Sequence, residues 1–230
     1  MEVSFLDPEL PPRFPDPREA CTEGLLGFGG RLEVDWLLTA YSSGIFPWFS
    51  ENEPILWWSP DPRCVLDLED LHVSRRLQRR ARSQEFRLSW NHAFSRVMEG
   101  CNERRADGIW ITPQMQRAYK NLFELGYAHS LEVWVGEDLV GGIYGVQIGG
   151  LFAGESMFHR CRDASKIALV ALRRSLGNAG IQLFDVQFLT PHLAQFGAKE
   201  IPRDLYLERL EEVRDLKVDL CRLEPRFTFL

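Results

Sequence analysis

The distribution of proline divides the chain into two parts of different character. Nine of the thirteen prolines, and four of the seven tryptophans, lie within the first 62 residues. Because proline lacks a backbone N–H and has a fixed φ, such a segment cannot build long helices or central strands of a sheet. We therefore predict a small, loop-rich N-terminal domain over residues 1–62 and a larger domain over residues 63–230.

Apolar residues beyond residue 62 alternate between helical and strand spacing. A spacing of three and four residues predicts helices, and alternation with a period of two predicts strands. The chain is expected to form helices over residues 33–43, 74–83, 112–126, 163–176, 191–196 and 202–216. Strands are expected over residues 131–135, 139–147, 151–158 and 181–189. Hairpins followed by a helix and a further strand predict an α+β (mixed α/β) fold.

Charge and composition exclude several classes of protein. The chain carries 27 basic and 33 acidic residues, a net charge of −6, which excludes a uniformly basic nucleic-acid-binding surface but not a local basic patch. No apolar run is long enough to span a bilayer, and the first residues lack a secretory signal. Five scattered cysteines without paired spacing indicate reduced thiols. The histidines lack ligand spacing, so we expect no metal site. The missing signal and span, together with the reduced thiols, predict a cytoplasmic protein without a membrane partner.

Two polar residues interrupt the apolar strand over residues 181–189. Strict alternation places Asp185 and Gln187 side by side on one face of the strand. Burying a carboxylate without partners is costly, so the pair needs an explanation. It is either an active-site pair or a buried polar pair that backbone groups satisfy.

A second acidic residue, Glu155, lies within the apolar strand over residues 151–158. Alone it could bind a cation or cap a neighbouring loop. If the strands that carry Glu155 and Asp185 are adjacent in the sheet, two carboxylates near an amide would suit a cationic substrate better than a metal.

Tryptophans occur in loops flanked by proline or glycine, around Trp48, Trp57 and Trp110. Such side chains line apolar pockets or stack on nucleic-acid bases. Equally, they could pack the N-terminal part onto the sheet.

Five arginines lie within eight residues on the helix predicted over residues 74–83. They are Arg75, Arg76, Arg79, Arg80 and Arg82. A charged helix face is commonly just solvated, but five charges of one sign in an acidic chain favour phosphate binding.

The signatures of several enzyme classes are absent from the sequence. It contains no P-loop, no GxGxxG after a strand, no GxSxG and no HExxH. Nothing in it indicates ATP, a dinucleotide, a serine nucleophile or catalytic zinc.

Taken together and in order, ten motifs resemble those of bacterial leucyl/phenylalanyl-tRNA–protein transferases. They are GIFPWFS (44–50), ILWWSPDPR (55–63), HVSR (72–75), GIWIT (108–112), HSLEVW (129–134), LVGGIYGV (139–146), LFAGESMF (151–158), ASK (164–166), DVQ (185–187) and the stretch 192–203 that includes GAKEIPR.

The resemblance implies an acetyltransferase-like (GNAT) fold for the C-terminal domain, beside the small proline-rich N-terminal domain. It implies transfer of Leu or Phe, and less of Met, from aminoacyl-tRNA to the α-amine of proteins that begin with Arg or Lys, which marks them for degradation. No cofactor is implied. The strand–helix junction over residues 159–166 lacks the glycines with which acetyltransferases of this fold bind coenzyme A. A monomer is expected.

The resemblance also implies roles for individual residues. Gln187 would accept a hydrogen bond from the attacking amine and Asp185 would orient it, while Glu155, with Asp185, would bind the cationic acceptor residue. The arginine helix would contact phosphates of the tRNA acceptor arm. The aminoacyl pocket and the stacking site for the terminal adenosine would comprise Trp48, Trp110, Ile143, Phe152 and Leu172.

At two of these positions the chain departs from the family pattern. Ile143 stands where methionine is found, and Leu172 stands where phenylalanine is found. Both changes alter the shape of the pocket, so the preference among Leu, Phe and Met is open.

Two other functions compete with this interpretation. One is a coenzyme A-dependent N-acyltransferase of the same fold, which the missing glycines oppose. The other is a non-catalytic RNA-binding module, which would leave Asp185, Gln187 and Glu155 unexplained on buried strands.

Overall fold

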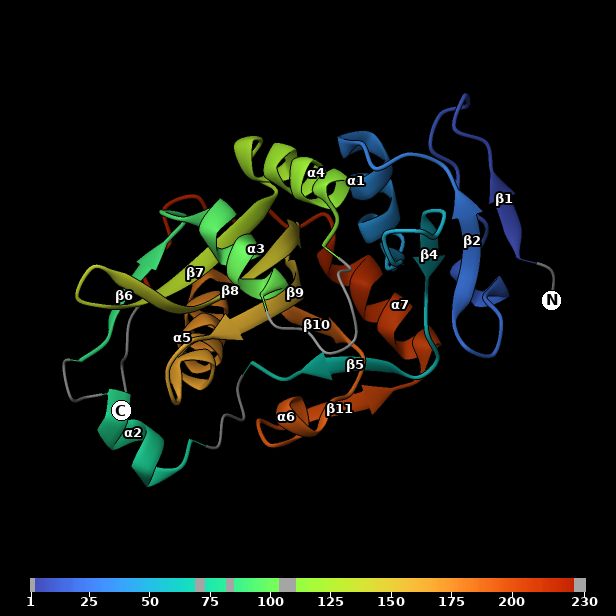
Figure 1. The fold of residues 1–230 in the computed structure, drawn as a ribbon. Coiled ribbons are helices and arrows are strands. Elements are labelled where there is room, and N and C mark those ends of the chain that lie inside the picture. Colours follow the sequence, from blue (N-terminus) through green and yellow to red (C-terminus); the bar gives the residue numbers. More distant parts are fainter. Residues whose placement is uncertain (1–2, 69–72, 82–84, 104–110, 226–230) are drawn as a thin grey trace.

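The computed structural model describes residues 3–68, 73–81, 85–103 and 111–225 and contains two β-sheets. A four-stranded sheet has the order β1-β2-β4-β3, and a seven-stranded sheet has the order β11-β5-β10-β9-β8-β7-β6 (Figure 1). In the large sheet β10 pairs parallel with β9, whereas its other pairs are antiparallel. The predicted mixed α/β class is therefore confirmed.

The small sheet is built from short strands, as expected for a proline-rich segment. Its elements are β1 (Ser4–Leu6), η1 (Pro17–Glu19), β2 (Leu25–Gly29), α1 (Val34–Ser42), β3 (Phe46–Pro47) and β4 (Leu56–Trp58). Helix α1 matches the predicted helix over residues 33–43. Its strands are too short for sequence periodicity to reveal, and none of them was predicted.

The large sheet contains the four strands that alternation predicted, together with three that it missed. Its strands are β5 (Arg63–Leu66), β6 (Arg87–Trp90), β7 (Ala128–Val135), β8 (Asp138–Ile148), β9 (Leu151–His159), β10 (Leu183–Gln187) and β11 (Ala198–Ile201). Strands β5, β6 and β11 span only four residues each, which is too short for a pattern.

Six helices accompany this sheet in the described part of the chain. They are α2 (Arg75–Ala81), α3 (Phe94–Asn102), α4 (Pro113–Glu124), α5 (Ala164–Ala179), α6 (Pro191–Ala194) and α7 (Arg203–Val213). Only α3 was missed, although Phe94, Val97, Met98 and Cys101 have helical spacing and are buried. No helix in the described ranges is long and apolar enough to cross a membrane.

The parallel pairing of β10 with β9 positions the polar residues that the sequence singled out. Asp185 lies opposite Ala153, two residues before Glu155. The two carboxylates therefore lie on adjacent strands, as the prediction required. Helix α1 also contacts β8 and α4, so its Tyr41 reaches the same region.

Candidate active site

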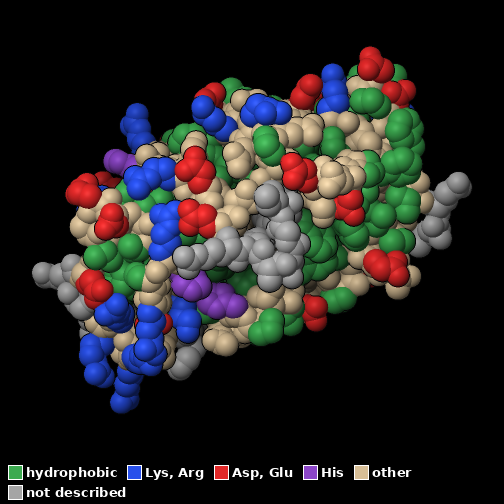
Figure 2. All heavy atoms as spheres, viewed as in Figure 1, with side chains coloured by type: hydrophobic (Ala, Val, Ile, Leu, Met, Phe, Trp, Pro, Cys, Tyr) green, Lys and Arg blue, Asp and Glu red, His purple; other side chains and the backbone are tan. Residues whose placement is uncertain are grey.

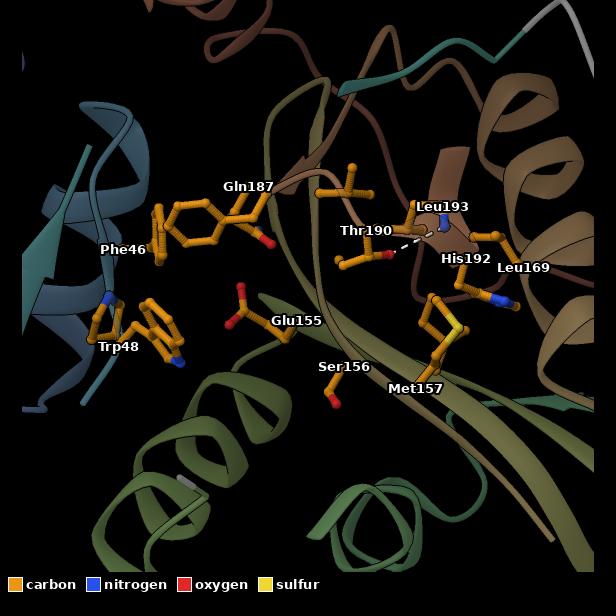
Figure 3. A pocket seen from close by; sticks show the side chains of 15 residues that line it. Phe46, Trp48, Glu155, Ser156, Met157, Leu169, Gln187, Thr190, His192 and Leu193 are labelled. Atoms are coloured by element: carbon orange, nitrogen blue, oxygen red, sulfur yellow. Dashed lines mark hydrogen bonds between the residues drawn. The ribbon is translucent and has the colours of Figure 1, made fainter. Parts of the chain in front are cut away.

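A cavity of about 430 Å³ lies where the N-terminal segment meets strands β8, β9 and β10. Phe46, Pro47 and Trp48 line it from the N-terminal side, and α5 and α6 contribute at the other end. In Figure 3 the Glu155 carboxylate lies between Trp48 and Gln187, while His192 is at the far end. The walls are largely apolar with a few polar groups, which is the usual composition of a small-molecule site.

A β-bulge at the end of β10 turns Gln187 toward this cavity. The register with β5 shifts between Asp185 and Gln187, and Gln187 has a φ of 57°. The N–H of Phe188 donates to Val186 O at 2.7 Å. As a result both Val186 and Gln187 line the cavity. The prediction that Asp185 and Gln187 share one face is wrong, because a bulge breaks the period of two.

Backbone carbonyls determine the orientation of the Gln187 amide. Its side-chain nitrogen can donate to Gly154 O at 2.9 Å and to Val186 O at 3.2 Å. Since only an N–H can satisfy two carbonyl oxygens, the network assigns the nitrogen to the backbone. The side-chain carbonyl oxygen is then the end of Gln187 that can accept a hydrogen bond from a ligand.

Asp185 is buried behind Gln187 and is fully engaged. Its Oδ1 accepts from Arg63 Nε at 2.9 Å and from the Gln187 N–H at 2.9 Å. Its Oδ2 accepts from Arg63 Nη2 at 2.6 Å and from the Tyr206 hydroxyl at 3.0 Å. The carboxylate thus stabilises the positive-φ backbone at Gln187, and it does not line the cavity.

Arg63, the partner on which this arrangement depends, was not predicted as a site residue from the sequence pattern. The Arg63 and Asp185 side chains are 1% and 0% exposed, and their two parallel bonds form a bidentate pair. Arg63 also donates to Gly44 O at 3.0 Å and lies over the rings of Phe46 and Tyr206. The available signal was an arginine that opens the apolar run 63–66.

Glu155 lies at the cavity wall among two tyrosines. Tyr41 donates to Oε1 at 2.8 Å and Tyr119 donates to Oε2 at 3.1 Å, while the two hydroxyl oxygens are 2.6 Å apart. Two hydroxyl hydrogens can fill only two of these three contacts. A protonated Glu155 would fill all three, because its O–H would donate to one tyrosine oxygen and that tyrosine's hydrogen would then go to the other tyrosine. In agreement, burial raises the pKa of Glu155 to about 7, despite the hydrogen bonds from the tyrosines.

Two family models match this chain. Residues 65–211 match the model of the leucyl/phenylalanyl-tRNA protein transferase, and residues 30–61 match the model of its N-terminal domain. The chain belongs to the leucyl/phenylalanyl-tRNA–protein transferase family. A transferase of this name from Shewanella sp. (strain W3-18-1) is 49% identical, with 99% of this chain and 98% of that protein covered. One from Anaeromyxobacter sp. (strain K) is 54% identical, with 86% and 87% covered.

Among solved structures, this member of the transferase family has GNAT-like neighbours. A GCN5-related N-acetyltransferase from Kribbella flavida is 10% identical with a TM-score of 0.39, covering 70% of this chain and 58% of that one. A GCN5-related N-acetyltransferase-like protein from Streptococcus suis is 13% identical with a TM-score of 0.35, covering 74% and 65%. The separate N-terminal domain is present, and its boundary after residue 62 stays a prediction.

Only some of the residues predicted for the aminoacyl pocket from the transferase family line the cavity. Trp48 and Ile143 line the cavity, and Trp48 is 45% exposed. Phe152 and Leu172 are buried in a core cluster that also contains Ile143, and they do not line the cavity. Trp110 lies outside the described residues. Trp57, by contrast, is fully buried against Phe14 and Trp36, so packing explains that tryptophan.

The arginine helix of this transferase family member is largely exposed. Arg75, Arg76 and Arg79 are exposed, whereas Arg80 forms a partly exposed ion pair with Glu85. Arg82 lies outside the described residues. Figure 2 shows Lys and Arg side chains gathered over α2. No group of three or more His, Cys, Asp or Glu in the described ranges has a geometry that could hold a metal.

Proposed function

We propose that this protein transfers Leu or Phe from aminoacyl-tRNA to the N-terminal α-amine of an acceptor protein. The observation that carries the proposal is the cavity with Gln187 and Glu155, in a chain about half identical over nearly its whole length to transferases of this name. Aminoacyl-tRNA and acceptor proteins are the partners that this activity implies. A cytoplasmic location is proposed because both substrates are available there, and the monomeric state stays a prediction.

The reaction exchanges an ester for an amide. The acceptor nitrogen attacks the ester carbonyl, the new C–N bond forms and the C–O bond to the tRNA ribose breaks. The amine loses a proton and the ribose hydroxyl gains one. Because the ester is already activated, the protein needs to hold the two substrates in line and to favour the neutral amine, whose reference pKa is about 7.7–8.0.

In this proposal Gln187 acts on the attacking amine. With its nitrogen on the backbone carbonyls, its side-chain oxygen accepts a hydrogen bond from the amine and aligns the nitrogen lone pair with the ester. Asp185 contributes indirectly, because its bond to the Gln187 N–H positions the bulge. Direct binding of the acceptor cation by Asp185, expected from the family resemblance, does not fit a carboxylate that Arg63 and Tyr206 already occupy.

Glu155 is proposed to select the cationic residue of the acceptor. Its carboxylate is at the cavity wall, and among the described residues its hydrogen bonds come from Tyr41 and Tyr119 rather than from a cation. A guanidinium or ammonium group would pair with the ionised form. Arg and Lys side chains are therefore preferred at the acceptor N-terminus.

The donor side chain and its adenosine are proposed to occupy the apolar part of the cavity. Trp48 offers a stacking surface and Ile143 a wall, while Phe152 and Leu172 shape the wall from the core behind it. A change of one methylene in such a pocket alters discrimination by about 1–3 kcal/mol. Exposed arginines of α2 would contact acceptor-arm phosphates without reading sequence.

A transfer assay tests the proposal. Labelled Leu-, Phe- and Met-tRNA are each offered with peptides that begin with Arg, Lys or Ala. Label is expected on the Arg and Lys peptides from Leu- and Phe-tRNA, with less from Met-tRNA. The ranking of donors measures the effect of Ile143 and Leu172. Label on no peptide, or equally on the Ala peptide, would contradict the proposal, and transfer from acyl-coenzyme A would favour an acyltransferase.

Glu155 is expected to make stability depend on pH. Burial raises the pKa of this acid from 4.5 to about 7, so between these values the folded state holds a proton that the unfolded state has lost. The free energy of unfolding of wild type, measured as its difference from that of Glu155→Gln, therefore falls as pH rises from about 4.5 to 7. Urea unfolding across this range measures the difference, with Glu53→Gln at an exposed site as control. Parallel curves for wild type and Glu155→Gln would contradict the assignment.

A further inference from the structure

A second cavity of about 490 Å³ adjoins the first, and His192 lines both. It lies between the start of α5, helix α6 and helix α2, whose Arg76 is also part of its wall. The cavity therefore connects the exposed arginines of α2 with the site of the proposed reaction. In Figure 2 histidine side chains lie between the basic cluster over α2 and the middle of the same face.

The wall of this second cavity is strongly basic. Arg76, Arg162 and Lys166 carry permanent charges, and His159 and His192 add two titratable groups. The carboxylate that faces them is Asp163, whose contacts with Arg76 and Arg162 are both 3.9 Å long. Ion pairs of that length at exposed arginines are weak, so among the described lining residues Asp163 leaves most of the positive charge uncompensated.

Two further features at this wall favour an anion. Asp163, at the start of α5, has a φ of 70° and its side chain makes no capping hydrogen bond. Asp163, Ser165 and Lys166 all line the cavity, so the positive end of this 16-residue helix borders it. The buried Nε2 of His192 has no hydrogen-bond partner among the described residues. Burial, and after it the neighbouring Lys166 and His159, lower the pKa of His192, so an anion bound at this wall would make protonation of His192 more favourable.

We propose that the second cavity binds the phosphodiester groups next to the 3′-terminal nucleotide of the donor tRNA, with Lys166 as the central contact. The proposal rests on the proposed function, because the aminoacyl group must occupy the first cavity. The nucleic-acid strand then runs from the arginines of α2, past the start of α5 and His192, to the ester. This path also gives a role to Lys166 within the Ala-Ser-Lys motif of the sequence, which the reaction itself does not use.

Two hydrolysis-resistant ligands test this phosphate site. The first is 3′-phenylalanylamino-adenosine, which has no phosphate, and the second is the same nucleoside extended to CpCpA. In wild type the extension is expected to tighten binding by about 10–100-fold, as for charge-assisted hydrogen bonds worth about 1.5–3 kcal/mol. Lys166→Met should lose most of this gain and leave the affinity for the nucleoside unchanged. For the Lys166→Met variant, the slope of the logarithm of the CpCpA binding constant against the logarithm of salt concentration should become shallower by about 0.7 for each lost phosphate contact.

Matched controls separate the possible outcomes. Lys217→Met, at an exposed lysine away from both cavities, should behave as wild type. An extension with neutral methylphosphonate links should give no gain in wild type. An undiminished gain in Lys166→Met would overturn the proposal. The proposal would also be overturned if the CpCpA extension did not tighten binding while coenzyme A bound wild type and lost affinity in Lys166→Met. If the nucleoside itself does not bind wild type, the proposed function fails rather than the phosphate site alone.

Discussion

Asp185→Ala is expected to lower the free energy of unfolding by about 3–5 kcal/mol, because it leaves the buried Arg63 guanidinium without its counter-charge. The same variant should lose transfer activity, since Asp185 also accepts the bond from the Gln187 N–H. Chemical denaturation measures the first effect and the transfer assay the second. Asp67→Ala, which removes an exposed partner of Lys199, is the control and should cost under about 1 kcal/mol.

A double variant separates stability from chemistry at this pair. Replacing both partners by apolar residues, Arg63→Met with Asp185→Leu, removes both buried charges together, and such replacements are often close to neutral. We expect the double variant to regain most of the lost stability and to remain inactive, because nothing then positions Gln187. The single variants Arg63→Met and Asp185→Leu are measured beside it. A loss of unfolding free energy in the double variant equal to the sum of the two single losses would contradict this role of Asp185, and so would full transfer activity in the double variant.

Gln187→Gly is expected to reduce transfer by about 10²–10⁴-fold, the range typical of a positioned proton-accepting group. The substitution removes the side-chain carbonyl that would meet the amine. At a φ of 57° glycine is free of the strain that costs a larger residue on the order of 1–3 kcal/mol, which offsets the loss of the side-chain bonds to Gly154 O and Val186 O, so thermal stability should stay close to that of wild type. The loss of activity is therefore not a folding defect.

Three measurements accompany the Gln187 variant. Single-turnover transfer gives the rate, thermal unfolding gives the stability, and binding of 3′-phenylalanylamino-adenosine tests the donor site, which should be little changed. Gln182→Ala, at an exposed position just before β10, is the matched control and should transfer normally. Near-normal transfer by Gln187→Gly would remove Gln187 from the proposed mechanism.

Much of the candidate site was recognisable from single residues in the sequence. Asp185, Gln187 and Glu155 are polar residues within apolar strands, and burial of such groups demands partners. Their placement on adjacent strands was only a condition of the interpretation, which the pairing of β10 with β9 meets. Arg63 was overlooked because a four-residue strand has no detectable period, and because its partner lies 122 residues away in the chain.

The sequence by itself determined the mixed α/β class, most of the helices and longer strands, and the family, because periodicity and ordered motifs are local properties of the chain. The tertiary structure alone decided that a bulge separates Asp185 from Gln187, that Arg63 neutralises Asp185, and that two tyrosines surround Glu155. It also decided that Phe152 and Leu172 lie in the core rather than on the cavity wall. These features depend on contacts between distant segments, and neither local propensity nor spacing encodes such contacts.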